Sequence, residues 1–311
     1  RMGTIKIPTA GMSRQEWLRL RREGIGGSDA GAVCGLNPYA SPMSVYRDKT
    51  SDETEEKDNE AMRQGRDLED YAARRFMEAT GLKVRRSHVM YKNREHPFML
   101  ADVDRLVAGE DAGLECKTAS AYGAGQWKDG RIPGHYVIQC LHYMAVTGKK
   151  SWYIAVVILG KEFKYVKLTW DEDMIRNLIE IEEAFWNAHV AARVMPEPDG
   201  SPACEEMLRR YFPGSVRGEI LLPDSFNADL KRREEIMGLV DRLETEQRRI
   251  EQKVKLFLGE SCGAGNSQYR VSWSSVDTQR IDSRRLKEEE PEIYSRFLKA
   301  GRSRRFTVKA A

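Results

Sequence analysis

The chain has 311 residues, of which 41% are hydrophobic, and a formal net charge of +3. This length allows one large core and a smaller appendage, and the near balance of charges confines any nucleic-acid surface to a local patch. The five cysteines form no C-x-x-C pair, which argues against zinc and iron-sulfur sites. With no signal peptide or bilayer-length apolar run, we expect a soluble, cytoplasmic protein with no membrane partner.

The first informative segment is "GIGGSDAG", with four glycines in eight residues, and Ser28 and Asp29 positioned to cap a helix. A helix N-terminus attracts phosphate through its free N–H groups, and glycines let a ligand approach the backbone. Just before this segment lies a basic cluster made of Arg14, Arg19, Arg21 and Arg22. The segment predicts a phosphate site, although a turn with a simple cap has the same pattern.

A helix is predicted from about residue 60 to 80, after a charged run over 51–60 that is typical of a solvated loop. Glu69 shares a face of this helix with small and apolar residues at i+3, i+4 and i+7. A buried carboxylate needs a cation. A metal ion would serve, and so would the helix's own Arg66 or Arg74.

Two strands, 98–107 and 113–117, are predicted around a glycine-rich loop. Ten residues separate Asp104 from Glu115, and Lys117 lies on the same strand face as Glu115. Adjacent antiparallel strands would bring these three side chains together. Carboxylates suit Mg²⁺, which can polarise a phosphoryl oxygen. The alternative is an ion pair on an exposed sheet surface.

A helix beginning at Pro133 follows, with Gln139 and Tyr143 on a face separate from its apolar stripe. That face is either polar surface or part of a site. A strand pair over 152–159 and 162–169, joined at Gly160, then leads to a helix over 171–194. "MPEPDGSPA" marks the end of the core.

Beyond this break, apolar residues with 4-3 spacing over 236–257 predict an amphipathic helix, either a coiled coil or one packed on another surface. "SQYRVSWSSV" and "RRFTVK" predict a small sheet. The last segment is basic and free of acids, and contains Arg302, Arg304 and Arg305. It is either a DNA-binding element or a solvated tail. We expect a nuclease core over 1–200, a linker over 201–225, and a C-terminal unit over 226–311.

Several blocks together resemble the YqaJ-type phage recombinase family, which includes phage lambda exonuclease and belongs to the PD-(D/E)xK nuclease superfamily. They are "RREGIGGSDAGAVCGLNPYASP", "MRQGRDLEDYAARRF", the Asp104 to Lys117 segment, "GHYVIQCLHYMAVTG" and "SWYIAVVILGKEFKYVKLTW". The "RRLKEEEPEIYSRFLKAGRSRRFTV" segment is similar to longer family members. The resemblance covers roughly residues 14–195.

This resemblance implies site roles. Asp104, Glu115 and the carbonyl of Cys116 would bind metal, with Glu69 at a second ion or positioning water. Lys117 would activate the nucleophile with help from Gln139, and Arg22 and Ser28 would receive a DNA 5′-phosphate. The expected cofactor is a pair of Mg²⁺ ions, for which Mn²⁺ can substitute.

We therefore expect an α/β restriction-endonuclease-like core, a mixed central sheet flanked by helices, with a C-terminal helical arm and a small C-terminal unit. By resemblance, the protein is a phage or prophage exonuclease that resects duplex DNA ends 5′ to 3′ for strand-annealing recombination. A single-strand annealing protein would be its partner, and a ring trimer its assembly. An endonuclease of the same superfamily and a non-catalytic DNA-end-binding module are the alternatives.

Overall fold

The computed structural model describes residues 3–51, 59–301 and 303–309, and the chain forms two compact units, Arg1–Phe212 and Pro213–Ala311. The boundary lies beyond the predicted core end at residue 200. Helix α7 (Pro202–Tyr211) belongs to the first unit, because its Cys204 and Met207 are buried against Met43. The predicted linker 201–225 therefore begins as a packed helix.

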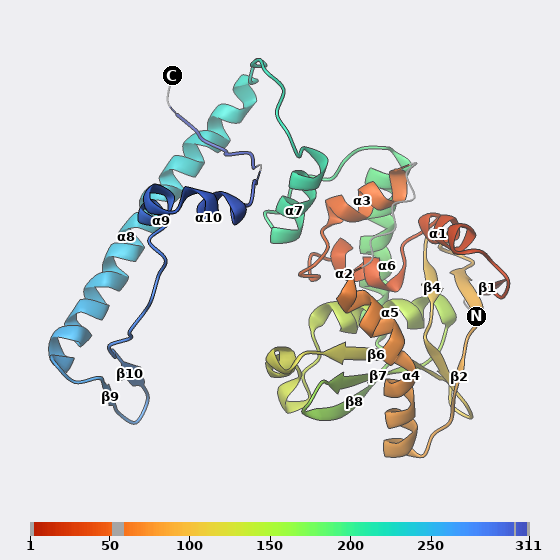
Figure 1. The fold of residues 1–311 in the computed structure, drawn as a ribbon. Coiled ribbons are helices and arrows are strands. Elements are labelled where there is room, and N and C mark those ends of the chain that lie inside the picture. Colours follow the sequence, from red (N-terminus) through yellow and green to blue (C-terminus); the bar gives the residue numbers. More distant parts are fainter. Residues whose placement is uncertain (1–2, 52–58, 302, 310–311) are drawn as a thin grey trace. The chain divides into compact units, whose positions relative to one another are not determined.

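A five-stranded mixed sheet forms the centre of the first unit, in the order β2-β5-β6-β7-β8 (Figure 1). Only β6 and β7 are parallel; every other pair in this sheet is antiparallel. The strands are Val84–Arg86, Arg105–Val107, Ala112–Ala119, Ser151–Ile158 and Glu162–Thr169. A second sheet, β1-β3-β4, contains Thr4–Pro8, Val89–Asn93 and Leu100–Asp102.

Helices cover both faces of the central sheet, because the buried strand β7 has apolar side chains on both sides. Helix α4 packs Ala73 and Phe76 on one face, and α5 packs Cys140 and Met144 with Ile154 on the other. These layers confirm the predicted α/β core. Besides α7, the helices of this unit are α1 (Arg14–Arg22), α2 (Gly27–Val33), α3 (Pro42–Thr50), α4 (Glu60–Thr80), the 3-10 segment Ala121–Gly130, α5 (Gly134–Thr147), α6 (Glu172–Phe185) and the π-helical turn Trp186–Ala191.

The stretch 98–107, predicted as one strand, is two strands in different sheets. Strand β4 ends at Asp102 on the smaller sheet, and β5 begins at Arg105 on the central sheet. Between them, the Asp104 carboxylate accepts the N–H of Cys116 at 2.8 Å. The prediction of one strand was wrong because both halves are buried, so their apolar pattern has no visible break.

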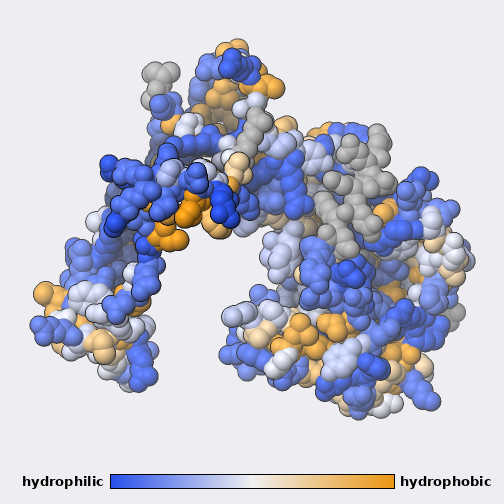
Figure 2. All heavy atoms as spheres, viewed as in Figure 1, coloured by the Kyte–Doolittle hydropathy of each residue, from blue (hydrophilic) through white to orange (hydrophobic). Residues whose placement is uncertain are grey.

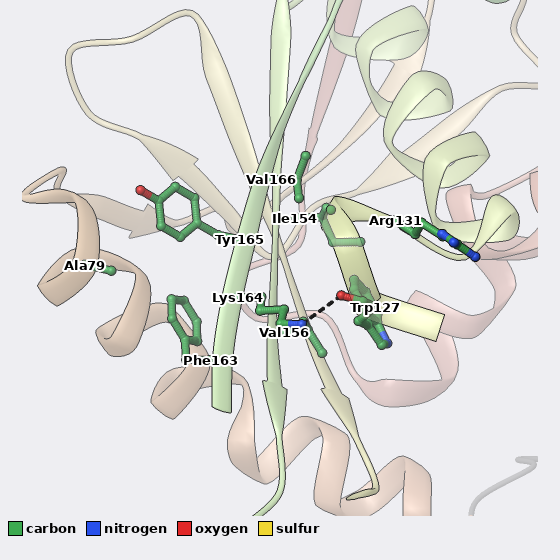
Figure 3. Close-up of a pocket in the computed structure, with 10 residues that line it drawn as sticks. Ala79, Trp127, Arg131, Ile154, Val156, Phe163, Lys164, Tyr165 and Val166 are labelled. Atoms are coloured by element: carbon green, nitrogen blue, oxygen red, sulfur yellow. Dashed lines mark hydrogen bonds between the residues drawn. The ribbon is translucent and has the colours of Figure 1, made fainter. Parts of the chain in front are cut away.

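A cavity of about 270 Å³ lies at the edge strand β8, and Figure 3 shows its lining. Phe163 and Tyr165 point toward α4, whereas Lys164 points to the other side and donates to the carbonyl of Trp127 at 2.9 Å. Figure 2 shows hydrophobic side chains gathered in the region of β7 and β8. No carboxylate lines this cavity, so it does not supply the predicted metal ligands.

The second unit contains the helix α8 (Asn227–Leu258), whose predicted apolar stripe is exposed at Ile236, Leu243 and Phe257. The predicted sheet partner of β10 (Arg270–Ser272) was wrong: β10 pairs with β9 (Gly263–Gly265), not with residues 304–309. The Asn266 side chain closes this hairpin by accepting two backbone N–H groups. The other elements are the 3-10 turn Asp224–Phe226, α9 (Ser283–Glu289) and α10 (Pro291–Arg296). Within the described residues, no helix is long and apolar enough to cross a membrane.

Candidate active site

Strand β6 and helix α5 bring three of the predicted residues together. Glu115 and Lys117 project from the same face of β6, with 2.5 Å between the Lys117 Nζ and Glu115 Oε1. The Gln139 amide donates to Glu115 Oε1 and to the Tyr143 hydroxyl, both at 2.8 Å. Glu115 is 3% exposed and Gln139 is 5% exposed. These groups are therefore neither an exposed ion pair nor a polar surface face.

Asp104 faces this group from the start of β5. The antiparallel register pairs Arg105 with Leu114, so Asp104 lies next to Glu115. Burial and the charge of Glu115 raise the pKa of Asp104 from 3.8 to about 8. For Lys117, burial favours the neutral amine, but Glu115 and Asp104 dominate and raise its pKa. The amine therefore stays charged at neutral pH.

The acid pair has the features of a cation site. Glu115 Oε2 is buried and has no hydrogen-bond partner among the residues that the structure describes, while the two neighbouring carboxylates repel each other. Within the described residues, no three Asp, Glu, His or Cys side chains are arranged to hold a metal ion. Two carboxylates and the Cys116 carbonyl would leave several positions for water or phosphate. This donor set fits Mg²⁺, which keeps several waters when bound to proteins.

Glu69 approaches Asp104 from helix α4. The partner expected for this carboxylate from the sequence was a metal ion, Arg66 or Arg74. In the structure, Glu69 forms an ion pair with Arg105 of β5. Burial and the negative charge of Asp104 raise the pKa of Glu69, while Arg105 opposes this effect. The carboxylate therefore lies within electrostatic reach of the acid pair.

The glycine-rich segment lies beside the acid pair because Ile25 joins it to β4. The Ile25 N–H donates to the carbonyl of Phe98, and the Leu100 N–H donates to the carbonyl of Ile25. A Cβ at Gly27 would come within 2.5 Å of the Tyr143 ring, so glycine permits this close packing. The segment is thus fixed between β4 and α5.

Ser28 reaches the site, but it does not cap the helix, and its arginine partner is Arg21. Gly26 is the N-cap of α2, and Asp29 accepts its N–H at 2.9 Å. The Ser28 hydroxyl accepts from Arg21 Nη2 at 3.3 Å, whereas Arg22 donates to the carbonyl of Ser51. Consecutive helical residues point about 100° apart, so only one of the two arginines faces Ser28.

A cavity of about 170 Å³ joins Ser28 and Arg21 to the acid pair. Trp17 and Asp102, which were not predicted from the sequence, also line this cavity. The Trp17 indole donates to Asp102 Oδ2 at 3.1 Å. The full lining is Trp17, Arg21, Gly26, Gly27, Ser28, Met90, Leu100, Asp102, Asp104, Glu115, Gln139 and Tyr143. Trp17 and Arg21 are four residues apart on a helix, and this spacing could have predicted that Trp17 lies on the same face as Arg21.

Arg304 and Arg305 are exposed residues of the second unit. Arg302 falls outside the described residues. Their predicted DNA contact therefore stays a prediction.

Comparison with known proteins identifies the family. The model of the YqaJ-like viral recombinase domain matches residues 16–150. Over 304 residues the chain is 35% identical to the uncharacterized protein YqaJ of Bacillus subtilis (strain 168), covering 96% of this chain and 95% of that protein. The chain belongs to the YqaJ family. The region that matches the family model contains Ser28, Glu69, Asp104, Glu115 and Lys117, and also Gln139.

A solved structure confirms the fold of this YqaJ family member. LHK-Exo in complex with dAMP has a TM-score of 0.51 and 21% identity, covering 63% of this chain and 97% of that chain. LHK-Exo is an alkaline exonuclease from Laribacter hongkongensis. A phage-related exonuclease from Haemophilus somnus has a TM-score of 0.41 and 12% identity, with 55% and 96% covered. The core therefore has the fold of LHK-Exo, with about a third of this chain outside that match.

Proposed function

We propose that this protein is a Mg²⁺-dependent exonuclease that degrades duplex DNA from its ends. The observation that carries the proposal is the buried set of Asp104, Glu115 and Lys117, in which Glu115 Oε2 has no hydrogen-bond partner in the described part of the chain. A DNA-end-binding module has no need for two adjacent buried acids. Family membership and the exonuclease fold support the same activity.

Residues that line the cavity or lie beside it divide the roles in this reaction. Asp104, Glu115 and the Cys116 carbonyl would hold Mg²⁺, for which Mn²⁺ can substitute, and a bound ion polarises the scissile phosphate. Lys117 orients the attacking water and neutralises negative charge that develops on the phosphate. Gln139 fixes the Glu115 carboxylate, with which it shares a hydrogen bond.

The end of the DNA strand would be held where Arg21 and Ser28 line the cavity. Arg21 and the Ser28 hydroxyl, 3.3 Å apart, present donors suited to a terminal 5′-phosphate. Cleavage would then proceed 5′ to 3′ and leave a single strand on which an annealing protein loads. This is the chemistry of phage-type recombination, and a ring trimer would enclose the duplex.

The test of the activity compares end-labelled linear duplexes with closed circles in the presence of Mg²⁺. The exonuclease degrades linear DNA and spares circles. Lys117→Ala abolishes degradation, because the charged amine beside the acid pair is lost, and Lys161→Ala in the exposed β7–β8 turn is the matched control. Opening of closed circles would show the alternative endonuclease. Wild-type rates in a folded Lys117→Ala variant would overturn the site.

The test of the 5′-phosphate uses neighbouring arginines. Wild-type protein degrades a 5′-phosphorylated duplex faster than a 5′-hydroxyl duplex. Arg21→Ala removes this difference, whereas Arg22→Ala keeps it, because Arg22 donates to the carbonyl of Ser51. The opposite pattern would restore Arg22 as the phosphate ligand.

We also propose that the basic C-terminal segment contacts the DNA backbone. Each phosphate contact contributes roughly 0.7–0.9 to the slope of log affinity against log salt. Replacement of Arg304 and Arg305 by alanine lowers affinity and makes this slope shallower. An unchanged slope would show that the segment is a solvated tail.

A further inference from the structure

A buried cation lies beside the acid pair. The Arg105 side chain is 5% exposed, although it begins next to Asp104 at the start of β5. Its guanidinium pairs with Glu69, donates to Asp70 Oδ1 at 2.6 Å, and donates to the carbonyl of Asp104 at 2.6 Å. Arginine is seldom buried without such partners. Three acceptors from two elements therefore hold it in place.

The position of Arg105 is fixed further by its neighbouring strand. Arg86 and Arg105 are paired in register across β2 and β5, and Arg86 donates to the second Asp70 oxygen at 2.6 Å. Asp70 thus bridges two arginines, while the adjacent Glu69 on the same helix pairs with Arg105. Movement of the Arg105 guanidinium would leave Glu69 without this partner, whereas Asp70 would keep Arg86.

This arrangement affects the number of metal ions. A second divalent ion was expected at Glu69, close to the ion at Asp104 and Glu115. An ion at Glu69 would have to displace the guanidinium or lie against it. If Glu69 turned to such an ion, the buried Arg105 guanidinium would lose one of its two carboxylate partners and would lie close to two divalent ions, which would be strongly unfavourable.

We propose that Arg105 takes the place of a second divalent ion, so that the site binds a single Mg²⁺ through Asp104 and Glu115. Glu69 is then a partner of Arg105 and not a metal ligand. Arg105 is a positioning residue, because it holds the backbone of Asp104 through the carbonyl. The inference rests on the proposed function and specifies its metal content.

The experiment counts Mn²⁺ ions in the full chain by electron paramagnetic resonance and calorimetry, with saturating dAMP as a phosphate that cannot be cleaved. Wild-type protein and Glu69→Gln each bind one Mn²⁺, with dissociation constants within about threefold of each other. Asp104→Asn, the control, loses the ion. Arg105→Met exposes Glu69 and binds a second Mn²⁺, which the additional Glu69→Gln change removes.

The outcomes separate this inference from the function on which it rests. Two ions in wild type that fall to one in Glu69→Gln would overturn the inference and leave the nuclease proposal intact. A folded Arg105→Met protein that still binds one ion would also overturn it. Absence of any Mn²⁺ binding in wild type would overturn the metal-dependent function as well. Should Arg105→Met fail to fold, the comparison of wild type with Glu69→Gln decides.

Discussion

Replacing Asp104 by asparagine should stabilise the metal-free protein. The change removes one of two neighbouring buried charges, and the amide oxygen can still accept the N–H of Cys116. In the wild type, folding raises the pKa of Asp104 from 3.8 to about 8. The folded chain therefore binds more protons than the unfolded chain between these values, so wild-type stability falls as the pH rises through this window.

The magnitude follows from the size of this shift. If relaxation of the metal-free site halves the four-unit difference, about two pKa units remain, which correspond to about 3 kcal/mol at pH 8. For a unit of this size, that energy raises Tm by about 6–12 °C. The advantage of Asp104→Asn should shrink as the pH falls toward 4, where Asp104 is increasingly protonated in both states of the wild type.

Thermal unfolding followed by circular dichroism, between pH 4 and pH 8 with EDTA, measures this difference. Mg²⁺ should then raise the Tm of the wild type, because it binds the folded state, and leave the variant unchanged. Glu23→Gln, an exposed substitution, controls for a general charge effect. Equal stability of Asp104→Asn and wild type at every pH, with no response of either to Mg²⁺, would refute the reasoning.

Two further predictions concern packing near the site. Gly27→Ala places a Cβ 2.5 Å from the Tyr143 ring and 3.0 Å from Gln139 Cγ. Because Gln139 must then shift, the rate of DNA cleavage should fall at least about tenfold with the fold retained. An unchanged rate would show that Gln139 need not keep its position. His142→Ala should destabilise the protein by about 3–5 kcal/mol in urea unfolding, because the fully buried Glu182 carboxylate loses its partner 2.8 Å away. Replacement of both His142 and Glu182 by leucine should be markedly less destabilising, and an equal loss would contradict the pairing argument.

The parts of the site that could be predicted depend on local spacing. Glu115 and Lys117 share a face because strand residues alternate, and the short loop before them predicts an antiparallel neighbour that carries Asp104. Glu69 and Gln139 were found from helical faces and family blocks. Such patterns predict the face on which a side chain lies.

The parts that could not be predicted depend on contacts between distant segments. The choice of Arg105 as the partner of Glu69, 36 residues away, and of Asp102 as the partner of Trp17, 85 residues away, follows from how two sheets and α1 pack. The same limit applies to Arg21 and Arg22, which the sequence does not distinguish as partners of Ser28. Both are basic, and only the rotation of α1 about its axis separates them.

The passage of the chain between two sheets at Asp104 has a mechanical consequence. Strand β4 ends at Asp102 in one sheet, β5 begins at Arg105 in the other, and the two residues between them include a proposed metal ligand. Glu115 belongs to the central sheet alone. An ion held by both carboxylates would link the central sheet to the segment that connects the two sheets. A small shift of one sheet relative to the other would then separate the two carboxylates and weaken ion binding.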